Sequence, residues 1–236
     1  MGYDNIIFDL YGTLVDVLTD ESLPAVWEET SGFMTAMGAP ITDEELKSRY
    51  FAILSEDVKS KGEFYEPDLY KTFKAIYGER GIVADKKLID KTGVVFRKAS
   101  TLLLKAYDGV LDGLKALRSA GKRIILLSNA QWVFTRYELE LLNLNNAFDK
   151  TYISSCCGVK KPSKEFFMMP IKELSLDISR TVMVGNDGTC DVLGAQSVGL
   201  DTIYFKTATS PDKEMPPATY CFSKQDMKGA LKIILK

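Results

Sequence analysis

The stretch from Ile6 to Asp16, IIFDLYGTLVD, decides the fold. Apolar and aromatic residues lead directly into Asp9, and a turn through Gly12 and Thr13 follows. A short, continuous apolar run is typical of a strand that is buried on both faces of a parallel sheet. We therefore expect a buried strand over residues 5–9 with a carboxylate at its carboxyl end.

Similar apolar runs recur along the chain, and amphipathic helical patterns lie between them. Alternation of strands and helices predicts a doubly wound α/β core, a Rossmann-like parallel sheet with helices on both faces. A last short strand, YCF, and a terminal helix are expected near the end. The further strands are predicted at 123–128, 151–155, 180–185 and 201–205, and the clearest intervening helices at 109–120 and 131–142.

One region interrupts the alternation. Residues 20–106 contain no convincing strand and show about four helical segments by apolar periodicity. Thr42 and Glu45 open the second segment as a capping box. The sequence thus predicts an α/β core of residues 1–17 and 107–236, with an all-helical cap of residues 18–106. Ligands of open α/β sheets bind at the carboxyl ends of the strands, so this insert would cover the site as a lid.

Composition narrows the function classes. The chain has 236 residues, a net charge of −2, four cysteines and no histidine. Catalysis that needs histidine, such as a Ser-His-Asp triad, is therefore excluded on this chain. The chain has no excess of basic residues that would indicate binding to nucleic acid. It also has no run of about 18 apolar residues that would indicate a membrane partner. We expect a cytoplasmic protein, either monomer or homodimer, whose cysteines are small core residues and whose partner is a small-molecule substrate.

Polar side chains follow each strand of the expected core. Because parallel strands bring their carboxyl ends to one edge of the sheet, a carboxylate, a hydroxyl, an ammonium group and further acids should surround one small space. The candidate side chains are Asp9, Ser128, Asn129, Lys160, Lys161, Asn186, Asp187 and Asp191.

Taken in this order, the motifs resemble those of the haloacid dehalogenase-like (HAD) hydrolase superfamily. They are DLYGT, the Ser128 strand end, a Lys-Pro pair and GNDGTCD, and the helical insert is similar to the cap of the first subgroup. The resemblance implies that Asp9 is a nucleophile that forms a covalent aspartyl intermediate. It also implies that Thr13 holds the loop, and that Ser128, backed by Asn129, donates a hydrogen bond to a substrate oxygen.

The resemblance assigns one of two adjacent lysines to the site. Lys161, just before Pro162, matches the motif better than Lys160. Its ammonium group would offset negative charge on nucleophile and substrate.

The resemblance further implies a magnesium site. In the magnesium-dependent members, the nucleophile, the backbone carbonyl of the residue at position Tyr11 and an acid of the fourth motif bind the ion. We favour Asp187 as that acid, with Asn186 as the alternative ligand through its amide oxygen. Asp191 would hold the lysine or a metal-bound water. Oxygen ligands of this kind suit Mg²⁺, which retains several waters.

Tyr11 departs from the pattern of the phosphatases, which carry an aspartate there as general acid. Losing that acid costs roughly 10²–10⁴-fold for an alkoxide leaving group, and a phenol with a pKa of about 10 is a poor substitute. A leaving group that needs no proton avoids the penalty. Halide is one, and phosphate or a carboxylate is another.

Three functions follow. The leading hypothesis is Mg²⁺-dependent hydrolysis of a small phosphorylated metabolite. The second is a metal-independent 2-haloacid dehalogenase, because DLYGTL resembles the first motif of those enzymes. In their fourth motif, however, those enzymes have Ser and Asn where this chain has acids. Arg49 is the nearest candidate for their halide-binding arginine. The third is a degenerate member that binds a phosphorylated ligand without turnover.

Overall fold

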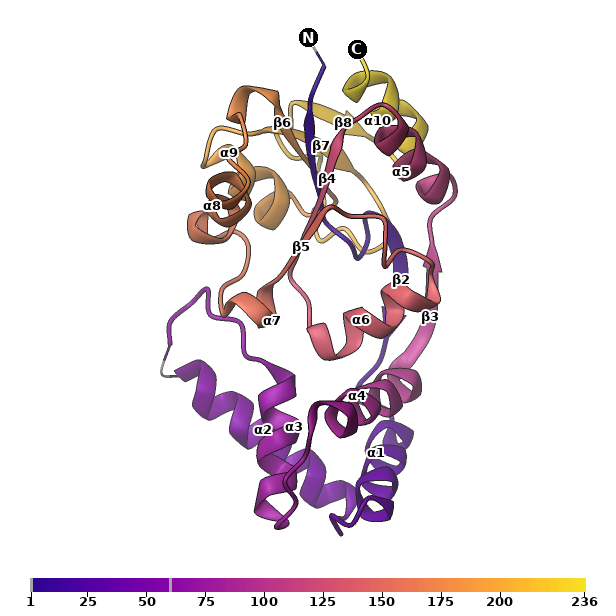
Figure 1. Ribbon diagram of the computed structural model, residues 1–236, viewed down its shortest axis with the longest axis vertical. Helices are drawn as coiled ribbons and strands as arrows, with labels where there is room; N and C mark the ends of the chain where they lie inside the picture. The colour runs from indigo at the N-terminus through magenta and orange to yellow at the C-terminus, as the bar shows by residue number, and fades with distance from the viewer. Residues whose placement is uncertain (1, 60) are drawn as a thin grey trace.

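The computed structural model describes residues 2–59 and 61–236. Among these residues, six strands form one parallel sheet in the order β5-β4-β1-β6-β7-β8 (Figure 1). This arrangement confirms the predicted α/β class and places β1 inside the sheet, between β4 and β6. The strands are β1 (Asn5–Phe8), β4 (Arg123–Ser128), β5 (Lys150–Ile153), β6 (Thr181–Gly185), β7 (Asp201–Phe205) and β8 (Tyr220–Phe222).

Both faces of the sheet are covered by helices. Ile6 and Phe8 of β1 belong to an apolar cluster shared with α5 (Val110–Ser119) and α10 (Met227–Ile234), whereas Ile7 belongs to a cluster shared with α8 (Lys164–Glu173). Alternate side chains of β1 are thus buried on opposite faces, which explains the uninterrupted apolar run. Shorter elements are α7 (Ser154–Cys157), a 3₁₀ turn (Ile178–Arg180), a π-helical segment (Gly188–Leu193) and α9 (Gly194–Gln196).

The four helices expected in the insert are present below the core in Figure 1. They surround an aromatic cluster in which the ring of Phe96 lies 5.4 Å from that of Trp27 and 5.6 Å from that of Tyr50. The capping box is confirmed: Glu45 N donates to Thr42 Oγ1 (3.2 Å) and Thr42 N donates to Glu45 Oε2 (3.1 Å). The helices are α1 (Pro24–Ala36), α2 (Asp43–Lys59), α3 (Leu69–Glu79) and α4 (Lys86–Ser100).

The prediction that residues 20–106 lack a strand is wrong at the end of that range. Helix α4 ends at Ser100, and β3 (Thr101–Ala106) pairs antiparallel with β2 (Val15–Thr19). This two-stranded ribbon joins the core to the helical insert (Figure 1). The leucines of β3 look like the continuation of a helical stripe, and their strand partner lies far away in the sequence. The exact boundaries at residues 17 and 107 stay a prediction.

Helix α6 (Trp132–Leu141) connects the core to the insert by packing. Its Phe134 ring stacks on Phe96 of α4, with ring centres 5.5 Å apart and planes at 5°. Arg97 of α4 forms an ion pair with Glu138 of α6 (2.6 Å), whose side chain is 1% exposed. The insert is therefore held against the core by both apolar contact and a buried charge pair.

The cysteines do not behave as predicted. Cys156 and Cys221 are exposed, and Cys157 and Cys190 are partly exposed, so none of the four is a buried core residue. Cys156 and Cys157 lie in the short helix α7, Cys190 lies in the π-helical segment, and Cys221 lies on the exposed edge strand β8, so none of them is on a buried face of the sheet.

Candidate active site

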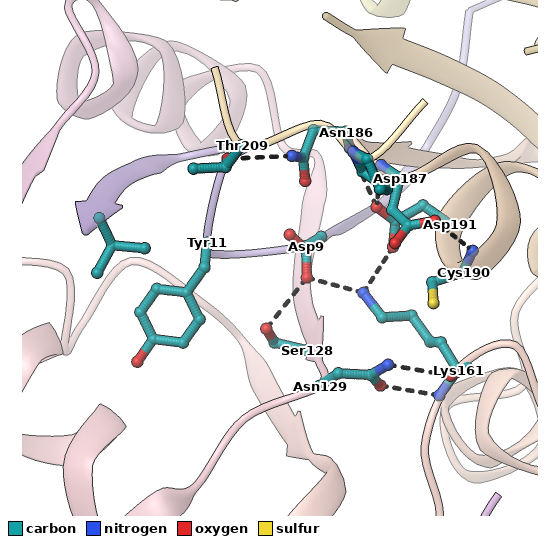
Figure 2. Close-up of a pocket in the computed structure, with 12 residues that line it drawn as sticks. Asp9, Tyr11, Ser128, Asn129, Lys161, Asn186, Asp187, Cys190, Asp191 and Thr209 are labelled. Atoms are coloured by element: carbon teal, nitrogen blue, oxygen red, sulfur yellow. Dashed lines mark hydrogen bonds and ion pairs between the residues drawn. The ribbon is translucent and has the colours of Figure 1, made fainter. Parts of the chain in front are cut away.

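Asp9 lies directly after β1, and its carboxylate is buried, with 6% of the residue exposed. Its Oδ1 accepts hydrogen bonds from Ser128 Oγ (3.1 Å) and from Lys161 Nζ (2.7 Å). Its Oδ2 accepts one from Thr13 Oγ1 (3.1 Å). Ser128 ends the neighbouring strand β4, so the parallel pairing itself brings the two groups together (Figure 2).

The turn after Asp9 requires glycine. Gly12 has a φ of +82°, in the left-handed region, and a Cβ atom there would lie 2.3 Å from Nδ2 of Asn186. The turn closes on Leu10, whose carbonyl oxygen accepts from the amides of Leu14 and Val15. The tight turn directs Thr13 back toward Asp9, which is the positioning role the motif predicts.

Of the two candidate lysines, Lys161 lines the pocket. Its Nζ donates to Asp9 Oδ1 and to Asp191 Oδ1 (2.6 Å), and its side chain is 2% exposed. Burial opposes its charge, but the carboxylates of Asp191 and Asp9 outweigh that cost and raise the pKa of Lys161. Lys160, the second candidate, faces away: its ammonium group lies 3.9 Å from Glu66 and it does not line the pocket.

Asn129 holds the backbone around this lysine. Its Oδ1 accepts from Lys161 N (2.8 Å) and its Nδ2 donates to Lys161 O (3.0 Å). The amide therefore fixes the loop that carries the ammonium group (Figure 2). Asn129 lines the pocket through this position.

Asp191 braces the other side of the site. Its Oδ1 accepts from Lys161, and its Oδ2 accepts from the backbone amides of Asn186 and Asp187, both at 3.0 Å. Burial raises the pKa of Asp191 to about 6, partly offset by Lys161. This acid joins the lysine to the loop after β6.

The two candidate metal ligands of that loop, Asp187 and Asn186, have different hydrogen-bond partners. Asp187 caps the π-helical segment, with its Oδ1 accepting from Thr189 N (2.9 Å) and Cys190 N (2.7 Å). Asn186 directs Oδ1 toward Thr13 Oγ1 (3.3 Å), on the side of Asp9, and Nδ2 toward Thr207 Oγ1 (3.2 Å). Both residues line a cavity of about 180 Å³ together with Asp9 and Tyr11.

These oxygen donors fit Mg²⁺, which binds through one or two carboxylates and keeps several waters. Within residues 2–59 and 61–236, no group of three or more Cys, Asp or Glu side chains gathers as a metal site. Asn186 and Tyr11 line the same cavity as Asp9, and they carry an amide oxygen and a backbone carbonyl oxygen as further donors.

The phenol of Tyr11 points away from Asp9 (Figure 2). Its hydroxyl donates to Glu138 Oε2 and lies 3.0 Å from Thr135 Oγ1, both on α6. The guanidinium of Arg97 lies 5.8 Å from the centre of its ring. Burial and the charge of Glu138 raise the pKa of Tyr11. The side chain thus links the catalytic loop to the boundary with the helical insert.

The residues around the phenol of Tyr11 carried no sequence signal. Glu138, Thr135 and Arg97 follow helical patterns that look like ordinary surface positions, and only the packing of α6 against α4 reveals them as partners of Tyr11. Val17, Cys190, Thr209 and Pro211 line the cavity.

Comparison with known proteins decides the family. A family model for haloacid dehalogenase-like hydrolases matches residues 3–199. The chain belongs to this family. A glyceraldehyde 3-phosphate phosphatase from Methanothermobacter thermautotrophicus is 27% identical to this HAD hydrolase over 199 residues, 84% of this chain and 83% of the relative.

Solved structures show the same fold. A HAD phosphatase from Thermococcus onnurineus has a TM-score of 0.59 at 20% identity, covering 98% of this chain and 97% of the other. A 2-haloacid dehalogenase from Pseudomonas syringae has a TM-score of 0.67 at 17% identity, covering 99% and 98%. At these identities the two structures establish the fold and leave the reaction open.

No described helix is long and apolar enough to cross a membrane.

Proposed function

We propose that this HAD hydrolase hydrolyses a small phosphorylated metabolite with Mg²⁺, through a covalent intermediate on Asp9. The observation that carries the proposal is the buried carboxylate of Asp9, which meets the hydroxyls of Thr13 and Ser128 and the ammonium group of Lys161. A buried, pre-oriented carboxylate beside a fixed cation is suited to nucleophilic attack on an anionic phosphoryl group. The phosphatase names of its relatives support the same reaction.

Each residue has a distinct task in this reaction. Asp9 attacks phosphorus, so one difficult displacement becomes two easier ones. Lys161 offsets the charge of nucleophile and phosphoryl group, and Asp191 keeps the lysine in place. Ser128 can donate to a phosphoryl oxygen from its present position beside Asp9.

A bound Mg²⁺ would be held by oxygens of Asp9 and Tyr11 and by Asp187 or Asn186, and would supply positive charge against the phosphoryl oxygens. Asp187 remains our preferred acid, because it lines the cavity and carries a carboxylate. Asn186 is the alternative, since its Oδ1 already faces Thr13.

Arg49, the candidate for the halide-binding arginine of a dehalogenase, does not lie at the cavity. Arg49 Nε donates to Glu79 Oε2 (2.9 Å) in an exposed ion pair between α2 and α3, and Arg49 does not line the cavity. The two acids of the fourth motif also favour phosphoryl chemistry, since Lys161 alone does not offset the three carboxylates of Asp9, Asp187 and Asp191 and a metal cation would reduce their repulsion.

Phosphate release from acetyl phosphate, glyceraldehyde 3-phosphate and phosphoglycolate, with Mg²⁺ and with EDTA, tests the proposal. We expect release from at least one compound that requires Mg²⁺, disappears in Asp9→Asn and falls at least 10²-fold in Lys161→Met. Lys160→Met is the matched control, since its ammonium group lies outside the pocket, and it should keep its activity.

The other hypotheses give different results in the same preparation. Chloride release from L-2-chloropropionate in EDTA would establish the dehalogenase instead. Tight binding of a phosphate ester without turnover would establish the non-catalytic hypothesis. Activity that survives Asp9→Asn would contradict the nucleophile assignment.

A further inference from the structure

The side chains that line the cavity beside Asp9 carry little positive charge. Among the described residues that line it, Lys161 is the sole basic side chain, and its ammonium group is already in contact with Asp9 and Asp191. Asp187 adds a third carboxylate to the lining. A substrate with a second anionic group beyond its phosphoryl group would find no cation there, and like charges at close range repel.

The cavity also lacks an effective proton donor for a leaving group. The hydroxyl of Tyr11 is engaged by Glu138 and Thr135 and points away from Asp9 (Figure 2). The ammonium group of Lys161 already donates to Asp9 Oδ1 and to Asp191 Oδ1.

The cavity is small and its remaining wall is partly apolar. Its volume is about 180 Å³, below the roughly 300–1,000 Å³ of pockets for drug-sized ligands. Val17 of β2 and Pro211 contribute apolar surface, and Thr209 adds one hydroxyl. A leaving group of a few uncharged atoms fits this space.

We propose that the preferred substrate is a small acyl phosphate with an uncharged acyl group, of which acetyl phosphate is the simplest. This inference rests on the proposed phosphatase function and specifies its substrate class. The leaving group is then a carboxylate, whose conjugate acid has a pKa near 4.3, so it departs without a proton.

The reaction balances without a general acid. A bond forms between Asp9 and phosphorus while the bond from phosphorus to the acyl oxygen breaks, and the electron pair leaves on the carboxylate. Water then attacks phosphorus, the bond to Asp9 breaks, and its electron pair returns to the Asp9 carboxylate. Both protons of the water stay on the product. Acyl phosphate dianion and water thus give a carboxylate and dihydrogen phosphate.

Three compounds measured with Mg²⁺ test the inference. Acetyl phosphate and ethyl phosphate are of similar size and differ in whether the leaving group needs a proton, and phosphoglycolate adds a carboxylate. We expect kcat/KM for acetyl phosphate to exceed that for ethyl phosphate by about 10²-fold or more. We expect phosphoglycolate to be poorer still.

Two gain-of-function variants test separately the missing proton donor and the missing second cation. Tyr11→Asp places a carboxyl group after the nucleophile and should narrow the ratio of acetyl to ethyl phosphate at least tenfold. Val17→Lys adds a cation to the cavity wall and should raise kcat/KM for phosphoglycolate at least tenfold relative to ethyl phosphate. Val17→Met is its matched uncharged control. A gain of activity cannot arise from misfolding. Val17→Lys therefore remains a valid test even if Tyr11→Asp is unstable.

The outcomes separate this inference from the function on which it rests. Ethyl phosphate hydrolysed within tenfold of acetyl phosphate, or phosphoglycolate preferred over both, would overturn the substrate class and leave the phosphatase function intact. No Mg²⁺-dependent release from any of these three compounds or from glyceraldehyde 3-phosphate would overturn both.

Discussion

Replacing Arg97 by methionine should destabilise the protein strongly, because it leaves the buried carboxylate of Glu138 without its cation. The two side chains are 12% and 1% exposed, and their atoms lie 2.6 Å apart. Removing one partner of a buried ion pair costs about 3–5 kcal/mol. Methionine keeps most of the apolar stem of arginine, so the effect reports mainly on the charge.

Thermal unfolding followed by circular dichroism measures this effect. For a chain of 150–250 residues, each kcal/mol lowers Tm by about 2–4 °C, so Arg97→Met should lower Tm by about 6–20 °C. The double variant Arg97→Met/Glu138→Leu leaves no unpaired charge and should recover part of the loss. A decrease below about 4 °C in Arg97→Met would mean that the pair is solvated like a surface ion pair and that the insert is not held by it.

Three further changes have defined outcomes. Asn129→Ala removes both contacts that fix the backbone of Lys161 and should lower kcat about tenfold or more with little change in KM; unchanged kcat would contradict its positioning role. Gly12→Ala places a Cβ 2.3 Å from the Asn186 side chain and should abolish most activity, while wild-type activity would refute the constraint on the turn. Thr42→Ala should lower the free energy of unfolding by about 0.5–2 kcal/mol in urea and leave kcat unchanged.

The arrangement of the core site could be predicted because topology alone determines it. Asp9 and Ser128 end neighbouring parallel strands, so their meeting requires only that the strands were recognised. Lys161 and Asp191 come from loops after other strands of the same sheet edge. The choice between Lys161 and Lys160 rested on a motif, and the loop geometry now separates them, with Lys160 beside Glu66.

The remaining features depend on contacts between distant segments. The leucines of strand β3 carry no period-2 pattern, and its partner β2 is separated from it in the sequence by the whole insert, so periodicity alone predicts a helix there. The partners of Tyr11 could not be predicted, since Glu138 becomes a buried charge only where α6 packs against α4. A sequence periodicity reports one face of a helix and does not reveal which element covers it.

Mass spectrometry of acid-quenched enzyme tests the proposed covalent route most directly. Enzyme stopped during turnover of acetyl phosphate with Mg²⁺ is predicted to carry one phosphoryl group on the peptide that contains Asp9, and Asp9→Asn is predicted to carry none. Steady turnover without modification of Asp9, or a phosphoryl group on another residue, would contradict the role of Asp9 as nucleophile.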